Sequence, residues 1–438
     1  MESPYQNGAP AAPPKSLWTA VTRSIDSPPK LTGTQKVDVG IVGAGFMGLA
    51  AALKLTKQGA RVAVADAADV GWGASGRNNG LVAPGLKRDP HEVRRLLGRE
   101  AGDRLLELSG NAPGQLFELI ESHGIKCDAV NSGWIQAAHS RFALSTIERR
   151  IKDWQDLGAD VEWIPETDVA SRLGTDYYCG AWFDSRGGSL NPLAYVRGLA
   201  RACVAAGASL YSGTPFLELE NSANRWLVHT PEGQLDCQNV LICTNAYGSD
   251  ITALRGTVIP LRTAQVASAP LSEHQARRIL PRGEAASDTQ RLLTSFRITP
   301  DNRLIMGGAD ATAGDEHPGL LQQLHLAASR RFPDLGAIHW QYGWSGYLAL
   351  TRDHLPVILR LGDGLYAGIG CNGRGIAMAT VVGELLADLA SGSSESDCAV
   401  PITPLRRMAS FHLRHPGVAM TVVANRVLDN LERRIIGI

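Results

Sequence analysis

A glycine-rich loop between a predicted strand and a predicted helix constrains the fold of this chain more than any other feature of the sequence. Residues 37–42 form an apolar run of strand length, and residues 43–48 follow with the spacing Gly-x-Gly-x-x-Gly. Residues 49–59 continue as an alanine- and leucine-rich segment that ends at a glycine, which is typical of a helix. A second predicted strand, residues 61–65, ends at Asp66. The pattern predicts a βαβ unit with parallel strands, the beginning of a Rossmann-like domain.

The three glycines of this first loop have separate tasks in a dinucleotide-binding unit. Gly43 allows a tight turn, Gly45 leaves the backbone bare for a pyrophosphate, and Gly48 lets the helix pack closely on the sheet. The helix N-terminus supplies N–H donors and a positive dipole end. Asp66, 18 residues after Gly48, is placed to accept hydrogen bonds from a ribose. The fingerprint itself does not distinguish NAD from FAD. The residues predicted to contact the cofactor here are Gly43, Ala44, Gly45, Phe46, Met47, Gly48, Asp66 and Ala67.

A second glycine-rich stretch, residues 71–80, follows closely. It holds a hydroxyl, a guanidinium and two carboxamides, which could reach the phosphates or ring edges of a long extended cofactor. An ordinary surface turn is the alternative interpretation. The predicted contacts in this second loop are Ser75, Gly76, Arg77, Asn78, Asn79 and Gly80.

A third loop, residues 370–375, again joins a predicted strand to the start of a predicted helix. One dinucleotide needs only one helix N-terminus for its pyrophosphate, so a second one indicates another site of negative charge. In a flavin that site is the N1/C2=O edge, which becomes anionic on reduction. Arg374 could reinforce this effect, pair with a substrate carboxylate, or be a solvent-facing cap charge. The predicted contacts are Gly373, Arg374, Gly375 and Ile376.

Composition excludes several other classes of protein. The 43 basic and 43 acidic residues balance, so nothing indicates the basic face of a nucleic-acid-binding protein. The 7 cysteines are scattered without a CxxC pair, which argues against a disulfide framework or a zinc site and favours a reducing compartment. No basic segment followed by an apolar run begins the chain, and no apolar run approaches the ~18 residues of a membrane span. We therefore expect a cytoplasmic protein without a bound metal.

These stretches together resemble the D-amino-acid oxidase family of FAD-dependent oxidoreductases, most closely the branch of γ-glutamylputrescine oxidase and sarcosine oxidase. The similar segments occur in order from residue 37 to residue 389. The resemblance implies an α/β fold, in which a Rossmann-like FAD-binding domain is interleaved with a mixed α+β substrate domain whose sheet roofs the flavin. It also implies oxidation of a C–N bond of an amine or amino acid by hydride transfer to flavin N5, giving an imine that hydrolyses. By the same resemblance, further cofactor contacts fall on Phe216, Thr244, Asn245 and Ala246.

The chain departs from the family pattern at two places. The putrescine-type enzymes carry a loop like Gly-His-Gly, where this chain has Arg374 between two glycines, and an arginine cannot act as a base near neutral pH. Residues 293–296 lack the cysteine that attaches the flavin in sarcosine oxidases, so we expect non-covalent FAD, with Cys371 leaving covalent attachment open. For the substrate pocket, Arg374 is joined by Trp344 and Tyr347 as candidates, although both aromatic residues could equally belong to the core.

The predicted organisation is an interleaved one. Residues 34–90, 180–254 and 345–400 are assigned to the FAD-binding domain, and residues 91–179 and 255–344 to the substrate domain. Residues 1–33 are expected to form an extended arm that is mobile or lies on the surface. Residues 401–438 are expected to form a helical segment whose arginines make a solvated face, with docking on a membrane surface or a partner as the alternative interpretation.

Several functions stay open at this stage. A nicotinamide-dependent dehydrogenase would explain the first loop but neither of the other two. A flavoprotein dehydrogenase would pass its electrons to a quinone or another carrier instead of O2, and a non-catalytic flavin-binding subunit of a larger oxidoreductase would carry out no reaction of its own. The expected partners are a small amine or amino-acid substrate and an electron acceptor, and the chain could form an oligomer.

Overall fold

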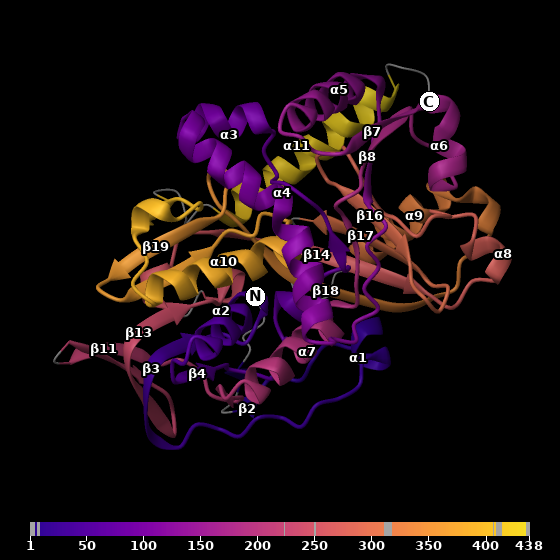
Figure 1. The fold of residues 1–438 in the computed structure, drawn as a ribbon. Coiled ribbons are helices and arrows are strands. Elements are labelled where there is room, and N and C mark those ends of the chain that lie inside the picture. The colour runs from indigo at the N-terminus through magenta and orange to yellow at the C-terminus, as the bar shows by residue number, and fades with distance from the viewer. Residues whose placement is uncertain are drawn as a thin grey trace.

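The computed structural model describes residues 5–6, 9–222, 224–248, 251–310, 318–405, 407–408 and 414–434. Two large sheets organise these residues, one with nine strands and one with eight. Figure 1 shows them side by side, with helices packed on their outer faces. Neighbouring segments in each sheet come from distant parts of the chain, so the two domains are interleaved as predicted.

The first sheet has the strand order β10-β4-β3-β13-β20-β19-β21, with β12 and β11 added beside β13. Its centre is parallel, and every residue of β4 is buried, as expected for strands covered on both faces. Its strands are β3 (Gly33–Val42), β4 (Val62–Ala65), β10 (Ser209–Tyr211), β11 (Glu218–Ser222), β12 (Arg225–His229), β13 (Gly233–Ile242), β19 (Val357–Gly362), β20 (Leu365–Ile369) and β21 (Ile402–Pro404).

Two helices leave the same edge of this sheet. Helix α2 (Phe46–Lys57) follows β3, helix α10 (Gly375–Ala390) follows β20, and both strands run parallel to β13 between them. The helices pack against each other so closely that a Cβ at Gly383 of α10 would lie 2.2 Å from the Met47 carbonyl oxygen. Their N-termini therefore point to one side of the sheet. Helix α7 (Pro192–Ala205) packs on the other side of α2.

The second sheet has the order β18-β14-β17-β16-β15-β6-β8-β7 and is antiparallel except between β15 and β6. Its strands are β6 (Trp134–Ala137), β7 (Val161–Pro165), β8 (Gly180–Asp184), β14 (Ile259–Ser268), β15 (Ala285–Asp288), β16 (Thr294–Ile298), β17 (Leu304–Asp310) and β18 (Trp340–Leu350). The helices around it and between the sheets are α3 (Pro90–Leu97), α4 (Arg99–Ser122), α5 (Arg141–Gln155), α6 (Glu166–Leu173), α8 (Glu273–Ala276) and α9 (Pro318–Arg331). Short strand pairs are β1 (Tyr5–Gln6) with β2 (Ala9–Pro10), and β5 (Leu81–Val82) with β9 (Gly188–Ser189).

The sheets correct three of the predicted domain boundaries. Strand β8 belongs to the second sheet, where it pairs with β6 and β7, although the prediction placed residues 180–184 in the FAD-binding domain. Strand β18 runs across the predicted boundary at residue 345, and β21 joins the first sheet beyond the boundary at residue 400. Hydrophobic alternation identifies a strand but not the sheet that it joins, because pairing partners lie far away in the sequence.

The N-terminal arm is more firmly packed than predicted. Helix α1 (Leu17–Val21) buries Leu17 and Trp18. The Trp18 indole N–H donates to the backbone oxygen of Asn78 at 2.8 Å, and its ring meets Trp344 edge-on at 6.0 Å. The expectation of a mobile or surface arm is therefore wrong for residues 17–21, since Trp18 of α1 is buried and hydrogen-bonds to the second glycine-rich loop.

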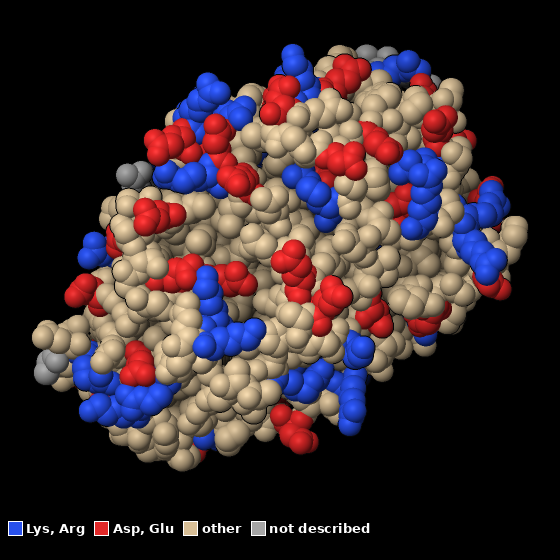
Figure 2. Space-filling view, in the orientation of Figure 1, with Lys and Arg blue, Asp and Glu red and all other residues tan. Residues whose placement is uncertain are grey.

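The C-terminal segment contains a helix, as predicted. Helix α11 (Arg414–Arg434) lies over the second sheet near α5, at the top of Figure 1, and buries Val422 and Asp429. It is therefore not a wholly solvated element. Among the described residues, no helix is both long enough and apolar enough to cross a membrane. Over the face drawn in Figure 2, basic and acidic side chains are interspersed.

Candidate functional site

A cavity of about 920 Å³ lies between the carboxyl edge of the first sheet and one face of the second. Alternate residues of β14, from Ile259 to Gln265, form its roof, because residues two apart on a strand share a face. Its other walls come from the three glycine-rich loops and from the C-terminal segment. The predicted site residues that line the cavity are Phe46, Ser75, Arg77, Asn78, Asn79, Asn245, Tyr347, Gly373, Arg374, Gly375 and Ile376.

The remaining predicted residues do not line this cavity. The first-loop glycines form the turn between β3 and α2, next to Phe46, and Asp66 follows β4. Met47, the second residue of α2, contacts α10 at Gly383. Phe216 is half-buried among side chains of the first sheet. The predicted residues outside the cavity lining are Gly43, Ala44, Gly45, Met47, Gly48, Asp66, Ala67, Gly76, Gly80, Phe216, Thr244, Ala246 and Trp344.

The first loop has the geometry of a close-approach turn. Gly43 adopts a φ of +109°, and a Cβ at Gly48 would lie 2.0 Å from the Gly43 carbonyl oxygen. The Ser75 hydroxyl accepts the N–H of Phe46 at 3.0 Å, so the second loop lies directly over the N-terminus of α2. A Cβ at Gly45 would lie 2.9 Å from that hydroxyl. The bare backbone at this helix start leaves room for a phosphate group beside Ser75.

Asp66 already stabilises the first loop within the protein. Its carboxylate accepts the N–H groups of Ala44 at 2.6 Å and Ala68 at 2.9 Å. Burial raises the pKa of Asp66, while these two backbone hydrogen bonds act in the opposite direction. The residue therefore shapes the turn in addition to the ribose contact predicted for it.

The second loop uses most of its polar groups to fix its own shape. The Arg77 guanidinium lies over the Trp72 ring at 4.1 Å, and its Nε donates to the Trp72 carbonyl at 2.7 Å. The Asn78 side chain donates to the Ala74 carbonyl at 3.0 Å and accepts the Gly80 N–H at 3.0 Å. These contacts hold a fixed wall around the cavity, with Arg77 5% exposed.

Two asparagines brace the third loop. Asn372, at a φ of +47°, donates to the Gly370 carbonyl at 2.7 Å and accepts the Thr351 N–H at 3.0 Å. Asn245, also at a φ of +47°, accepts the Gly370 N–H at 3.0 Å. Asparagine tolerates this left-handed conformation better than most residues. Asn245 is among the residues predicted from the sequence, whereas Asn372 is not, although an asparagine before a glycine in a loop is a signal for such a turn.

A group of cationic side chains, which we call the cationic cluster, lies where the cavity meets the second sheet. It comprises Lys87, Arg150 and Arg374. The Arg374 guanidinium stacks over the Trp134 ring at 4.4 Å. Arg150 pairs with Asp89 at 2.6 Å. For Lys87 and Arg374 no ion pair is formed within the described part of the chain.

The cationic cluster has unbalanced positive charge. Lys87 keeps much of its surface open, but this surface faces the cavity. Burial lowers the pKa of Lys87 to about 8, and the charges of Arg374 and Arg150 act in the same direction. Burial also lowers the pKa of Arg374 to about 10. Bringing an anionic group between them would relieve this repulsion. Lys87 and Arg150 are not among the predicted residues, because charged residues in a loop and a helix carry no local signal of a shared cavity.

The two aromatic candidates take different positions. Tyr347 lines the cavity, and its backbone N–H donates to the Tyr247 hydroxyl at 3.1 Å. Trp344 is 4% exposed, and its indole N–H donates to the Arg77 carbonyl at 2.9 Å. Trp344 therefore supports the second loop from behind the cavity wall and is removed from the catalytic candidates.

The sequence match decides the family. Residues 38–389 match the model of the DAO family, described as FAD-dependent oxidoreductases. The chain belongs to this family. Its cofactor is accordingly FAD. The structure fits that cofactor, since the cavity extends from Phe46 and Ser75 at the start of α2 to Gly375 at the start of α10.

Relatives of this DAO-family chain are oxidoreductases. It is 30% identical to a probable oxidoreductase OrdL of Haemophilus influenzae, over 84% of this chain and 86% of the relative. It is 29% identical to the gamma-glutamylputrescine oxidoreductase of Escherichia coli, over 82% and 84% respectively. The crystal structure of glycine oxidase from Geobacillus kaustophilus superposes with a TM-score of 0.71, covering 85% of this chain and 99% of that one at 22% identity. The family and the fold confirm the predicted flavoenzyme architecture, and the chain is an FAD-dependent oxidoreductase of the class that acts on amines or amino acids.

Proposed function

We propose that this enzyme oxidises the C–N bond of a small amine or amino acid that carries a carboxylate. The observation that supports this proposal is the cationic cluster. Its members Arg374 and Lys87 line the same cavity as Gly375, the first residue of α10. Bound FAD supplies the hydride acceptor at N5. The residues of the chain bind the donor and orient its C–N bond, and the imine product hydrolyses in water.

The walls of the cavity suit this reaction because the chemistry asks mainly for orientation and exclusion of water. A neutral amine can release a hydride without a strong protein base, and the third loop offers an arginine where a base would otherwise be expected. Arg374 and Lys87 would hold the donor carboxylate, while Tyr347 and the β14 roof cover the apolar part of the donor. The backbone N–H groups at the start of α10 would stabilise negative charge on the reduced cofactor.

We also propose the cofactor contacts, the cellular compartment and the mode of FAD binding that the sequence predicts. Ser75, Arg77, Asn78, Asn79 and Asn245 would line the phosphate and flavin side, and Asp66 the ribose. All seven cysteines are free, which supports a reducing compartment such as the cytoplasm. We propose non-covalent binding of FAD, although the half-exposed thiol of Cys371 lies in the cavity wall.

Anaerobic bleaching of the flavin tests the proposed function. The purified holoenzyme is mixed without air with amines, N-methyl amino acids, D- and L-amino acids and cyclic imino acids, and the loss of visible flavin absorbance is followed. We expect rapid bleaching by at least one carboxylate-bearing donor and slower bleaching by its decarboxylated counterpart. Readmitting air then distinguishes an oxidase from an enzyme that needs another acceptor. Bleaching by no amine or amino acid would favour the non-catalytic flavin-binding subunit instead.

A pH series tests the part played by Lys87. Its pKa of about 8 means that the side chain is cationic below this pH and neutral above it. The ratio of kcat/KM for a carboxylate-bearing donor to that for the matched plain amine should therefore fall about tenfold between pH 7 and pH 9. Both rates are first corrected for the fraction of neutral amine. In a Lys87→Met variant the ratio should no longer change over this range, and the same fall in the variant would remove Lys87 from the proposal.

A further inference from the structure

Part of the cavity wall comes from outside the region that matches the family. The match ends at residue 389, yet five residues beyond it line the cavity. Four of them lie on helix α11, which packs over the second sheet (Figure 1). The five residues are Met408, Gly417, Thr421, Val422 and Asn425. The far side of the substrate space is therefore bounded by this C-terminal helix.

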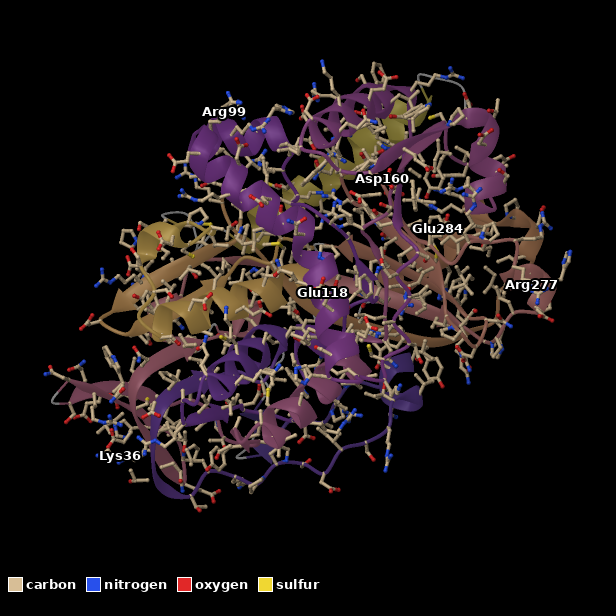
Figure 3. The ribbon with its side chains drawn as sticks, in the orientation of Figure 1. Lys36, Arg99, Glu118, Asp160, Arg277 and Glu284 are labelled. Atoms are coloured by element: carbon tan, nitrogen blue, oxygen red, sulfur yellow. The ribbon has the colours of Figure 1, made fainter. Side chains whose placement is uncertain are left out.

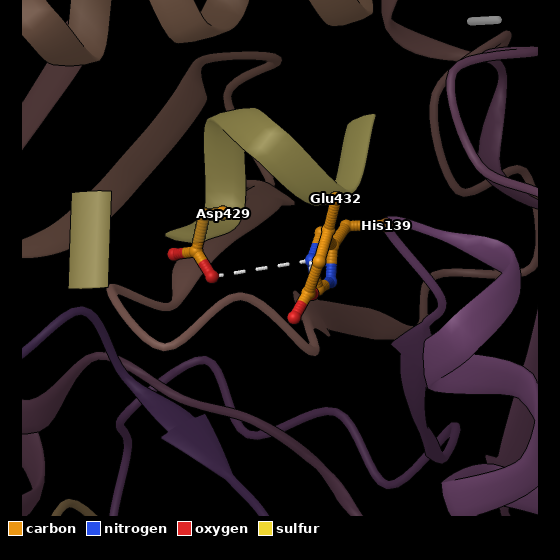
Figure 4. A group of neighbouring side chains, drawn as sticks. All are labelled: His139, Asp429 and Glu432. Atoms are coloured by element: carbon orange, nitrogen blue, oxygen red, sulfur yellow. Dashed lines mark ion pairs between the residues drawn. The ribbon is translucent and has the colours of Figure 1, made fainter. Parts of the chain in front are cut away.

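Ion pairs attach α11 at this position. The buried Asp429 carboxylate accepts a hydrogen bond from the Arg291 guanidinium at 2.8 Å, and Glu432 pairs with the same guanidinium at 2.6 Å. Asp429 also accepts the backbone N–H groups of Arg291 at 3.3 Å and Leu292 at 3.4 Å. The His139 Nε2 lies 3.3 Å from a Glu432 oxygen and 4.0 Å from an Asp429 oxygen. Figure 4 shows these three side chains beside one another. We call Arg291, Asp429 and Glu432 the clasp.

Hydrophobic packing contributes less to this attachment. Residues 421, 422, 425, 429 and 432 share one face of the helix, and of the described ones only Val422 is a buried apolar side chain. Larger apolar side chains on α11 face away from the cavity, with Met420 73% exposed and Val423 60% exposed. Among the side chains of α11 that the structure describes, the clasp therefore contributes more to its position than apolar burial does.

A metal ion is the alternative occupant of this cluster. His139, Asp429 and Glu432 have ligand atoms within 4.8 Å of one another. The Arg291 guanidinium, however, already pairs with both carboxylates, and the His139 Nδ1 lies 2.8 Å from the Thr289 hydroxyl. A divalent cation would have to displace the arginine, so we interpret the cluster as an ion-pair attachment.

We propose that α11 selects the donor: Thr421, Val422 and Asn425 limit the length of the molecule that fits the cavity, and the clasp holds these side chains in place. The inference rests on the proposed function for the identity of the donor. Its geometric part, a helix that covers the flavin cavity, stands without it. Since Arg291 and Leu292 also line the cavity, the clasp joins both sides of the same opening.

A double variant, Asp429→Asn with Glu432→Gln, tests the cover. We expect the fluorescence of bound flavin to be quenched by iodide about threefold more strongly. KM for the longest donors should fall relative to KM for the shortest, because the released helix no longer limits donor length. The matched control is Arg277→Gln, which removes an exposed ion pair with Glu273 on α8, a helix at the opposite end of the second sheet (Figure 3). This control should change neither measurement.

A second variant keeps the clasp and fills the cavity. Thr421→Trp should raise KM for the longest accepted donor about tenfold and leave the shortest donor within about twofold, with iodide quenching unchanged. Two results would overturn the inference. One is unchanged quenching in the double variant, and the other is a rise in KM in Thr421→Trp that is equal for donors of all lengths. The quenching measurement needs no donor, so it separates this result from a failure of the proposed function.

Discussion

Replacing Arg374 by alanine is expected to lower kcat/KM for carboxylate-bearing donors about 100-fold, because a bidentate arginine–carboxylate contact contributes on the order of 3 kcal/mol in a site shielded from water. The side chain lines the cavity and stacks over Trp134, and no carboxylate within the described residues neutralises it. Amines without a carboxylate make no such contact, so their kcat/KM should fall less than tenfold. Steady-state kinetics on matched pairs of donors measure the difference.

The conservative variant separates charge from geometry at this position. Arg374→Lys keeps the positive charge but loses the planar fork, and it should give an intermediate loss on carboxylate-bearing donors. Flavin content, measured from the visible spectrum, controls for loss of the cofactor in both variants. Equal losses on both kinds of donor would assign Arg374 to the flavin edge, where it would reinforce the positive end of α10. A lowered flavin reduction potential would accompany that outcome.

Local turn chemistry explains why the sequence predicted much of the cofactor-binding region. The tight turn at Gly43 and the close packing at Gly48 involve only a few consecutive residues. They can therefore be predicted from the local sequence, without knowing which distant segments pack nearby. The start of α10 follows the same rule, with Gly370 and Gly373 both at positive φ. The sheet then brought the two helix N-termini together because β3 and β20 both flank β13 in parallel.

Long-range contacts explain what the sequence could not show. Trp18 lies beneath the second loop although 60 residues separate it from Asn78, its hydrogen-bond partner. Lys87, Arg150 and Arg374 come from a loop, a helix and a distant strand end, and only the folded chain places them around one cavity. Trp344 shows the same limit at closer range. It lies on the strand face of Leu348 and Leu350, which line the cavity, but the second loop covers its indole.

The largest effect on the cofactor is expected for Gly48→Ala, which should leave the purified protein with little or no FAD. The added Cβ would lie 2.0 Å from the Gly43 carbonyl oxygen and 3.2 Å from an Ile41 methyl group. The start of α2 would have to move away from β3, and the turn that leaves room for the pyrophosphate would change shape. Overpacking of this kind costs the native conformation about 3 kcal/mol. Because FAD needs the native turn, its binding free energy has to offset this cost, which corresponds to a roughly 100-fold rise in the Kd for FAD.

Titration of the apoprotein with FAD, followed by flavin fluorescence, measures this loss, and circular dichroism shows whether the variant is folded. Gly114→Ala is the matched control, because Gly114 lies within helix α4 and its Cβ would meet no heavy atom within 4 Å. Alanine there should leave the affinity for FAD unchanged and raise stability by about 0.5–1 kcal/mol. A folded Gly48→Ala variant that binds FAD as tightly as the parent chain would show that the pyrophosphate does not depend on this turn, and the cofactor contacts proposed for the first loop would have to be placed elsewhere.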